Sequence, residues 1–256
     1  MDTIRHDLPK FSELEICVLS DTHLGDPLVD YKKLDKFFDE ILEVENRYLI
    51  VNGDILNWAS KNSVSDIYSE MYPTNEQIDV ACDLLEKVKD RILVVIEGNH
   101  ELRAYKEGIL PMYQVTKRLG IFHTYAPSGC YLLIIKFGKS QGRDIRKMPY
   151  AIYGKHGSGG GKKVGSKMNK LEDMQQIIDA DIFVHSHTHT PAVFKKDFFR
   201  VDYRNEKKTS ITQLFVNSNA WLKYGGYGEV KGYTPTSTDY PIIILDGIER
   251  NAKAIL

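Results

Sequence analysis

The chain has 256 residues and a formal net charge of −1, with 42% hydrophobic and 27% charged residues. This composition is ordinary for a soluble globular protein, and the length suits one α/β domain, so we predict a single domain over residues 1–256. The near-neutral charge excludes a global field that attracts nucleic acid or membranes. No apolar run approaches the roughly 18 residues that a membrane span requires.

Cysteine usage and the first residues bear on the cellular compartment. The three cysteines show no Cys-x-x-Cys spacing, so a disulfide framework is not expected, and Cys17 lies in an apolar run that predicts a buried, inert thiol. Residues 1–7 do not combine a basic region with a following apolar stretch, so no secretion signal is expected. These features favour a cytoplasmic location.

The first 100 residues alternate between apolar strands and amphipathic helices. Strands are predicted at 14–20, 47–52 and 91–96, and helices at 31–45 and 75–89. The strands are almost continuously apolar, which indicates burial on both faces. The alternation of three strands with two helices predicts a parallel sheet.

The second half contains fewer helices and more strands that resemble hairpins. The predicted elements are a helix at 167–179 and strands at 131–137, 150–154, 181–185, 192–203, 211–217 and 241–246. Residues 192–216 read as a hairpin whose turn lies around Arg204 to Lys207. This half therefore predicts a mixed second sheet.

Five clusters of potential metal ligands follow directly after predicted strands. They are Asp21-Thr22-His23, Gly53-Asp54, Gly98-Asn99-His100, His156-Gly157 and His187-Thr188-His189. Ligands of an open α/β sheet gather at the carboxyl ends of its strands. Two divalent cations roughly 3.5–4 Å apart require a bridging anion and further neutral or anionic ligands, which carboxylate, imidazole and amide groups provide. The clusters therefore predict a dinuclear metal site.

The order of these motifs resembles that of the calcineurin-like metallophosphoesterase superfamily. The order is Asp-x-His, Gly-Asp, Gly-Asn-His-Glu, a lone His, and His-x-His before Pro191. The motifs span residues 21–191, about two-thirds of the chain. The resemblance implies a four-layer αββα sandwich with two mixed β-sheets. The pattern of the first half supports this α/β fold directly, and that of the second half supports it loosely.

The resemblance also implies a role for each motif residue. Asp21, His23 and His189 would hold the first metal, Asn99, His156 and His187 the second, and Asp54 would bridge both. His100 would contact the substrate and protonate the leaving oxygen, so His100 and Asp54 are the expected catalytic residues, and Asn99 is also expected to bind substrate. A hydroxide activated by the metal pair would attack phosphorus in line.

The type of ligand limits the choice of metal. A set of nitrogen and oxygen ligands without a thiolate favours Mn, Fe or Zn over Ca, and we expect two divalent cations with Mn as the favoured ion. His156 carries the least motif information, because one His-Gly dipeptide is common. The tract from His185 to His189 admits two His-x-His registers, and Thr190-Pro191 favours the second, which leaves His185 outside the ligand set.

Two departures from the family pattern bear on substrate. Ser186 stands where the family usually has Gly. The Ser/Thr protein phosphatase branch carries Asp-Arg-Gly from the position of Asn57, and its Arg binds phosphate. Here the sequence is Asn57-Trp58-Ala59, so that Arg is missing. The chain looks closer to the nuclease-like and phosphodiesterase-like bacterial or phage members.

A local excess of positive charge surrounds one predicted ligand. Residues 136–170 contain ten Lys or Arg residues and one acid, and His156 lies inside this tract. The backbone of Gly157 to Gly161 can form an anion-binding nest, followed by Lys162 and Lys163 as candidate substrate-binding residues. The alternative is a solvated basic loop without a role in binding.

Two further segments have open interpretations. Arg103 follows Gly-Asn-His-Glu and either contacts substrate phosphate or pairs with Glu101 or Glu107. The stretch from Asn217 to Tyr240 is rich in Gly and aromatic residues. It either stacks a base near the site or forms a rim packed by its own side chains.

These features predict a metal-dependent phosphoesterase that hydrolyses a phosphodiester in a nucleotide or nucleic acid, without a membrane partner. The alternative is a phosphomonoesterase that acts on a small metabolite or a phosphoprotein. A catalytically silent protein that only recognises phosphate is a third possibility from another class. The oligomeric state stays open.

Overall fold

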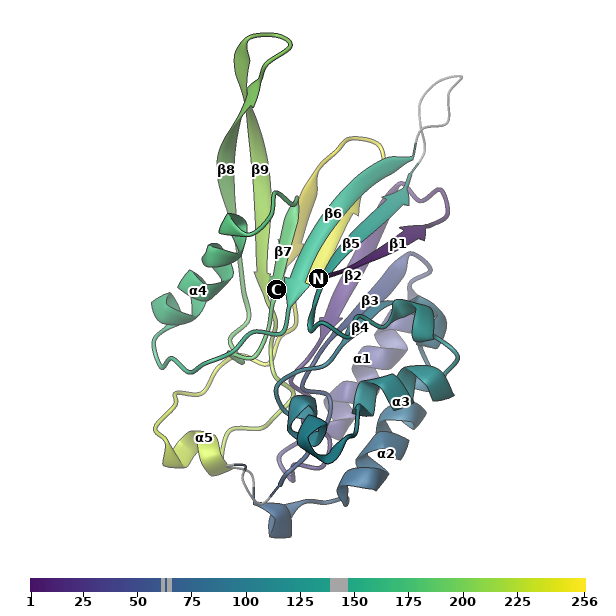
Figure 1. The fold of residues 1–256 in the computed structure, drawn as a ribbon, viewed down its shortest axis with the longest axis vertical. Helices are drawn as coiled ribbons and strands as arrows, with labels where there is room; N and C mark the ends of the chain where they lie inside the picture. Colours follow the sequence, from purple (N-terminus) through teal and green to yellow (C-terminus); the bar gives the residue numbers. More distant parts are fainter. Residues whose placement is uncertain (61–62, 64–65, 139–146) are drawn as a thin grey trace.

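Two β-sheets lie face to face in the computed structural model, with helices on their outer faces (Figure 1). The structure describes residues 1–256 apart from 61–62, 64–65 and 139–146, so part of the basic tract predicted from the sequence lies outside the described residues. Within the described part, one sheet has five strands and the other has six.

The five-stranded sheet contains the predicted parallel strands. Its order is β11 (Ala252–Ile255), β10 (Ile242–Asp246), β2 (Glu13–Leu19), β3 (Arg47–Asn52) and β4 (Ile92–Ile96). Strands β2, β3 and β4 run parallel, while β10 is antiparallel to both β2 and β11. The three strands predicted in the first half are confirmed.

The six-stranded sheet is mixed, as predicted. Its order is β1 (Asp2–Asp7), β5 (Cys130–Phe137), β6 (Met148–Lys155), β7 (Ile182–His185), β9 (Lys207–Asn217) and β8 (Ala192–Asp202). Strands β6, β7 and β9 run parallel, and β8 and β9 form the predicted hairpin. Figure 1 shows the outer part of this hairpin projecting away from the body.

The helices and sheets form four layers around three apolar clusters. Helices α1 (Tyr31–Glu43), α2 (Thr74–Glu86) and α3 (Pro111–Arg118) cover the outer face of the five-stranded sheet, and α4 (Val164–Glu172) covers the outer face of the six-stranded sheet. The middle cluster fills the space between the sheets. This arrangement confirms the predicted αββα sandwich.

Alternation along β2 shows how one strand serves two layers. Cys17 and Leu19 pack toward the helices, whereas Ile16 and Val18 pack between the sheets. Successive side chains of a strand point to opposite faces, so a strand buried on both sides needs a continuous apolar run. Cys17 is fully buried, and burial raises the pKa of its thiol to about 12, as expected for an inert cysteine.

Some elements differ from the sequence-based expectation. Helix α4 begins before the predicted start at residue 167, and it ends at Glu172, where a 3₁₀ turn continues over Asp173–Gln176. Strands β1 and β11, helix α3 and the short helix α5 (Gly226–Val230) were not predicted. Among the described helices, none combines the length and hydropathy that crossing a bilayer requires.

Candidate metal centre

The predicted ligands converge at one end of both sheets. Asp21, Asp54 and Asn99 follow β2, β3 and β4, which run parallel and therefore end at the same edge. His156 follows β6, and the loop after β7 carries the last two histidines. Every ligand therefore stands on a turn held by a buried strand, which fixes its position better than a free loop would.

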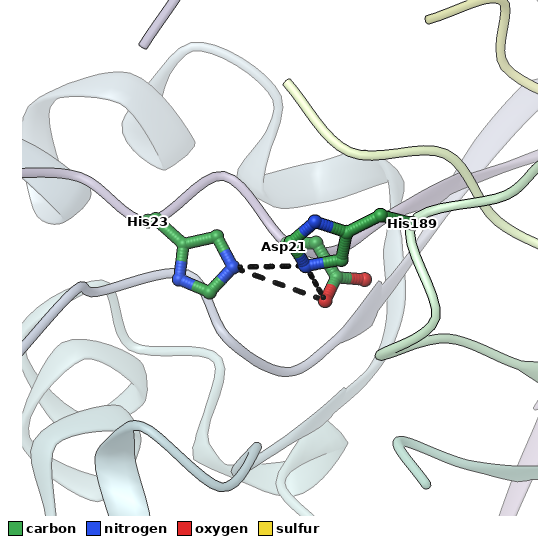
Figure 2. Close-up of side chains that lie close together, drawn as sticks. All are labelled: Asp21, His23 and His189. Atoms are coloured by element: carbon green, nitrogen blue, oxygen red, sulfur yellow. Dashed lines mark hydrogen bonds and ion pairs between the residues drawn. The ribbon is translucent and has the colours of Figure 1, made fainter. Parts of the chain in front are cut away.

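The first group of ligands comprises Asp21, His23 and His189. Their ligand atoms all lie within 4.8 Å of one another. The Nε2 atoms of His23 and His189 are 3.3 Å apart, and His189 Nε2 lies 3.1 Å from Asp21 Oδ1 (Figure 2). Two imidazole nitrogens bound to one cation in tetrahedral geometry lie about 3.4 Å apart. The spacing fits a metal between them.

The Asp21 carboxylate presents one oxygen to this group and uses the other for support. Oδ2 accepts hydrogen bonds from Ser20 Oγ at 2.7 Å and from the His187 backbone N–H at 3.1 Å. Oδ1 is buried and has no well-aligned hydrogen-bond donor. A buried carboxylate oxygen without a donor is costly unless a cation faces it, so the orphaned atom fits a metal ligand.

The second group comprises Asp54, His156 and His187, with Asn99 beside it. The ligand atoms of the three lie within 4.8 Å of one another. His156 Nε2 is 3.0 Å from Asp54 Oδ2 and 3.2 Å from Asn99 Oδ1. Asp54 Oδ1 accepts the backbone N–H of His100 at 2.8 Å, which leaves Oδ2 facing the site.

The tautomer of His156 shows why a cation belongs here. Its Nδ1 lies 2.8 Å from the Asn52 carbonyl oxygen, which can only accept, so the ring proton sits on Nδ1. The Nε2 lone pair then faces two oxygens that are themselves acceptors. Burial lowers the pKa of His156, but the Asp54 carboxylate outweighs burial and raises it to about 10. This shift shows that the surrounding oxygens favour positive charge at this position, which a bound cation would supply.

The backbone at the ligands is strained in a shared way. Five of the ligands are non-glycine residues with positive φ: Asp21 (51°), His23 (50°), Asp54 (51°), His187 (66°) and His189 (54°). Only two other described non-glycine residues, Trp58 and Glu206, share this left-handed conformation. Each such residue costs on the order of 1–3 kcal/mol, and strain of this kind gathers at functional sites.

His100 lies at the edge of both groups. Its ligand-type atoms fall within 4.8 Å of those of His23 and Asp54, and its Nε2 lies 3.9 Å from Asp54 Oδ2. Its Nδ1 is 2.7 Å from the carbonyl oxygen of Asn57, so Nδ1 carries the proton and Nε2 exchanges one. Burial lowers the pKa of His100 to about 4, although Asp54 opposes this shift.

A buried network orients the Asn57 carbonyl. This oxygen also accepts a hydrogen bond from Arg103 Nη1 at 3.2 Å, which places the guanidinium beside His100. The Asn57 side chain donates to Glu70, and the Gln77 side chain accepts the Trp58 N–H at 3.0 Å. Arg103 therefore lies at the edge of the site, where the sequence placed it.

Glu101 has a role that the motif alone did not reveal. Its carboxylate accepts the backbone N–H groups of Asp54, Leu56 and Gly98 at 3.0, 2.8 and 2.7 Å. It is fully buried, and burial together with the Asp54 carboxylate raises its pKa to about 8. Glu101 thus joins the ligand loops that follow β3 and β4.

Other candidates lie outside the two ligand groups. His185 is buried beneath Gly157, and its Nδ1 is 2.9 Å from Asn217 Oδ1, so it supports the loop after β7. Lys162 and Lys163 are exposed at the start of α4. Lys162 lies over the Tyr233 ring, with Nζ 6.0 Å from the ring centre. The structure thus places these two lysines at the start of α4, and neither belongs to the two ligand groups.

The family model described as Calcineurin-like phosphoesterase matches residues 14–191. The match covers more than half of the chain, and the chain therefore belongs to the calcineurin-like phosphoesterases, a family of hydrolases that use divalent metals. No curated protein matches the sequence.

Several solved structures are similar over most of the chain. A predicted phosphoesterase from Streptococcus pneumoniae is 16% identical, with a TM-score of 0.42 over 96% of this chain and 90% of that one. Vacuolar Protein Sorting 29 from Cryptosporidium parvum is 14% identical, with a TM-score of 0.46 over 95% and 97%. The nuclease MPE from Pseudomonas putida is 12% identical, with a TM-score of 0.38 over 94% and 87%.

Proposed function

We propose that this protein is a dinuclear metal-dependent phosphodiesterase that acts on a nucleotide or nucleic acid. The observation that carries the proposal is the convergence of two ligand groups, in which Asp54 Oδ2 and Asp21 Oδ1 face several imidazole nitrogens. Asp21, His23 and His189 would hold one cation, Asn99, His156 and His187 would hold the other, and Asp54 would bridge both, since it groups with His156 and His187 and also with His23. Mn is the favoured ion, since the ligands are nitrogen and oxygen atoms.

The cations, when bound, supply positive charge opposite the phosphate oxygens and lower the pKa of an attacking water. The chain itself positions the acid. The Asn57 carbonyl holds the His100 ring by Nδ1, which leaves Nε2 free to carry a second proton to the leaving oxygen. Because burial lowers the pKa of His100 to about 4, the ring must first take up that proton in the substrate complex. The Asp54 carboxylate, 3.9 Å from Nε2, stabilises the protonated imidazole. Asn99 and Arg103 border the same space and contact the phosphate.

Charge supports a diester substrate. A phosphate monoester carries about 1.5–2 negative charges at neutral pH, whereas a diester carries about one. The Arg that binds monoester phosphate in the protein phosphatase branch is replaced by Trp58, which is 3% exposed and packs in the core. Arg103 borders the centre, and Lys162 and Lys163 are exposed at the start of α4. These residues suit an extended substrate with phosphates outside the reacting centre.

A comparison of two chromogenic esters tests the reaction class. With Mn present, we expect a higher kcat/KM on bis-p-nitrophenyl phosphate than on p-nitrophenyl phosphate, and no turnover after treatment with EDTA. A preference for the monoester would assign the same centre to a phosphomonoesterase. Absence of turnover on either ester, across Mn, Fe and Zn, would leave a protein that only binds phosphate.

Asp54→Asn tests the shared ligand. The amide keeps the shape and can still accept the His100 N–H, but it removes the charge that both groups use. We expect less than one bound metal per chain by elemental analysis and a fall in kcat/KM of about 10³-fold or more, on the scale of losing charge stabilisation in an active site. Asp35→Asn, at an exposed ion pair on α1, is the control and should keep both metals. Full activity of Asp54→Asn would refute the bridging role.

A further inference from the structure

Two loops singled out separately by the sequence meet each other near the start of α4. Lys162 belongs to the glycine-rich basic loop, and Tyr233 belongs to the aromatic loop between β9 and β10. Lys162 Nζ lies 6.0 Å from the centre of the Tyr233 ring. The Tyr233 hydroxyl lies 3.3 Å from the point where a Cβ on Gly160 would stand, so the ring reaches across the glycine backbone.

Both loops are held in place by the protein itself. The Tyr233 N–H donates to the Gly228 carbonyl at 2.9 Å, and the Tyr224 hydroxyl donates to the Tyr233 carbonyl at 2.9 Å. On the opposite side, the Lys170 ammonium donates to the carbonyl of Ser158 at 2.7 Å. A surface fixed before the ligand arrives loses less conformational entropy on binding.

A short stretch of chain joins each loop to a candidate ligand of the metal centre. Gly160 is four residues after His156. Thr236 Oγ1 donates to the His189 carbonyl at 2.8 Å, and the three residues from Thr236 back to Tyr233 span at most about 11 Å. Figure 1 shows the segment around α5 at the end of the six-stranded sheet where β9 finishes. Tyr233 is thus joined by a short segment to a residue that contacts the backbone of His189.

Charge and exposure indicate what this junction binds. Residues 155–170 contain five lysines and no acid. Lys162 is exposed and Tyr233 is half-buried, and among the described residues the three apolar clusters do not include Tyr233. A ring outside these clusters, beside a segment rich in lysine and without acidic residues, has the two components of a site for single-stranded nucleic acid.

We propose that Tyr233 and Lys162 form a nucleotide subsite at the rim of the metal centre. Tyr233 stacks on an unpaired base next to the scissile phosphate, and Lys162 pairs with the following phosphate. This inference rests on the proposed function and names single-stranded nucleic acid as the substrate class. Duplex nucleic acid does not fit, because its bases are already stacked on one another.

Binding to the metal-free protein separates the subsite from the chemistry. The full chain is treated with EDTA, and the dissociation constant for a fluorescein-labelled deoxythymidine dodecamer is measured by anisotropy at several salt concentrations. We expect Tyr233→Ala to weaken binding about 5- to 100-fold, while Tyr233→Phe stays within twofold of the wild type, since the phenyl ring keeps the stacking surface. Lys162→Ala should weaken binding and reduce the salt slope by about 0.7.

Matched controls lie on the hairpin tip, where Tyr203 is 87% exposed. Tyr203→Ala and Lys207→Ala should leave binding unchanged. The subsite is overturned if the wild type does not bind the dodecamer, if Tyr233→Ala binds like the wild type, or if a duplex of equal length binds as tightly. If the proposed function is wrong, the result is different. The protein would then not hydrolyse bis-p-nitrophenyl phosphate, while the effects of the variants on binding of the dodecamer would be unchanged.

Discussion

Two glycines allow the ligand loops after β3 and β4 to touch. Gly53 has a φ of +84°, and a Cβ there would stand 2.6 Å from the Gly98 nitrogen. A Cβ on Gly98 would stand 2.2 Å from both the backbone nitrogen and Oδ1 of Asp54. The position of the Asp54 carboxylate therefore depends on a bare backbone opposite it.

Gly98→Ala should displace Asp54 and disrupt the metal centre. The contact is with backbone and with a fixed carboxylate, so relief requires a loop shift that costs about 1–3 kcal/mol, or roughly 2–12 °C in Tm. Bound metal should fall below one ion per chain by elemental analysis. Gly165→Ala is the control, because a Cβ at this position in α4 meets nothing within 4 Å. Two retained metals in Gly98→Ala would show that the loops can separate without loss of the site.

The sequence identified residue types more reliably than it identified their contacts. Of the two histidine registers, the structure brings His189 to 3.1 Å from Asp21 Oδ1, while His185 lies apart beside Asn217. Pro191 was the signal that separated them. The three backbone bonds of Glu101 were not foreseeable, because they depend on the path of two loops and not on residue type.

Helix α4 reaches the histidine loop through a buried lysine. Lys167 is 7% exposed, and its ammonium donates to Thr190 Oγ1 at 2.6 Å. Thr190 Oγ1 in turn donates to the Thr188 carbonyl at 3.1 Å, so the bond steadies the segment that contains His187 and His189. Burial lowers the pKa of Lys167. The sequence read this residue only as part of a basic tract.

Lys167→Met should destabilise the loop that carries His187 and His189 without creating a cavity in the core. The apolar side chain keeps the packing of the lysine stem but cannot donate to Thr190, which leaves a buried hydroxyl with one bond fewer, a loss of about 1–3 kcal/mol. We expect a weaker metal affinity, about tenfold, in a titration with Mn. Lys196→Met, at an exposed pair with Glu172, should titrate like the wild type. Equal affinities in both variants would assign Lys167 to packing alone.

The misplaced boundary of α4 has a physical reason. The last residues of the predicted helix, 173–179, continue as a 3₁₀ turn and then leave the helix before β7. Apolar spacing alone does not mark this change. Strand β1 pairs with β5 across more than 120 residues of sequence, and β11 is a short edge strand, so neither gives a strong local signal.

The centre draws its ligands from both sheets. Asp21, Asp54 and Asn99 come from the five-stranded sheet, and His156 and His187 come from the six-stranded sheet. A cation shared between the groups would therefore join the two halves of the sandwich. A metal that binds the folded state but not the unfolded state adds stability in proportion to the logarithm of the free metal concentration.

Removing metal should lower the melting temperature by a predictable amount. At a free Mn concentration 100 times the dissociation constant, the bound ion adds about 2.7 kcal/mol, which corresponds to roughly 5–11 °C for a chain of this size. Differential scanning calorimetry with EDTA and with graded Mn would measure it. Asp54→Asn should show little response to Mn. A wild-type Tm independent of Mn would argue against a site that spans both sheets.

The first half of the fold could be predicted from the sequence, because its contacts join elements that follow one another in the chain. The strands around Cys17, Ile50 and Val94 are continuous apolar runs joined by amphipathic helices, and such a pattern defines a parallel sheet. The second half depends on pairings between distant segments, such as β10 with β2. Those pairings are set by tertiary packing, so the sequence indicated a mixed second sheet but not the place of β1 in it.

Five of the candidate ligands have a left-handed backbone, which lowers the stability of the fold. Selection for stability and selection for catalysis therefore favour different residues at these positions. Glycine adopts this conformation without strain, and asparagine tolerates it better than most residues. A population of variants screened only for thermal resistance without metal would therefore accumulate Gly or Asn at Asp21, His23, Asp54, His187 and His189. Such proteins would melt later than the natural chain and would no longer hold the ions, so the residues that make the enzyme are the ones a stability screen would discard first.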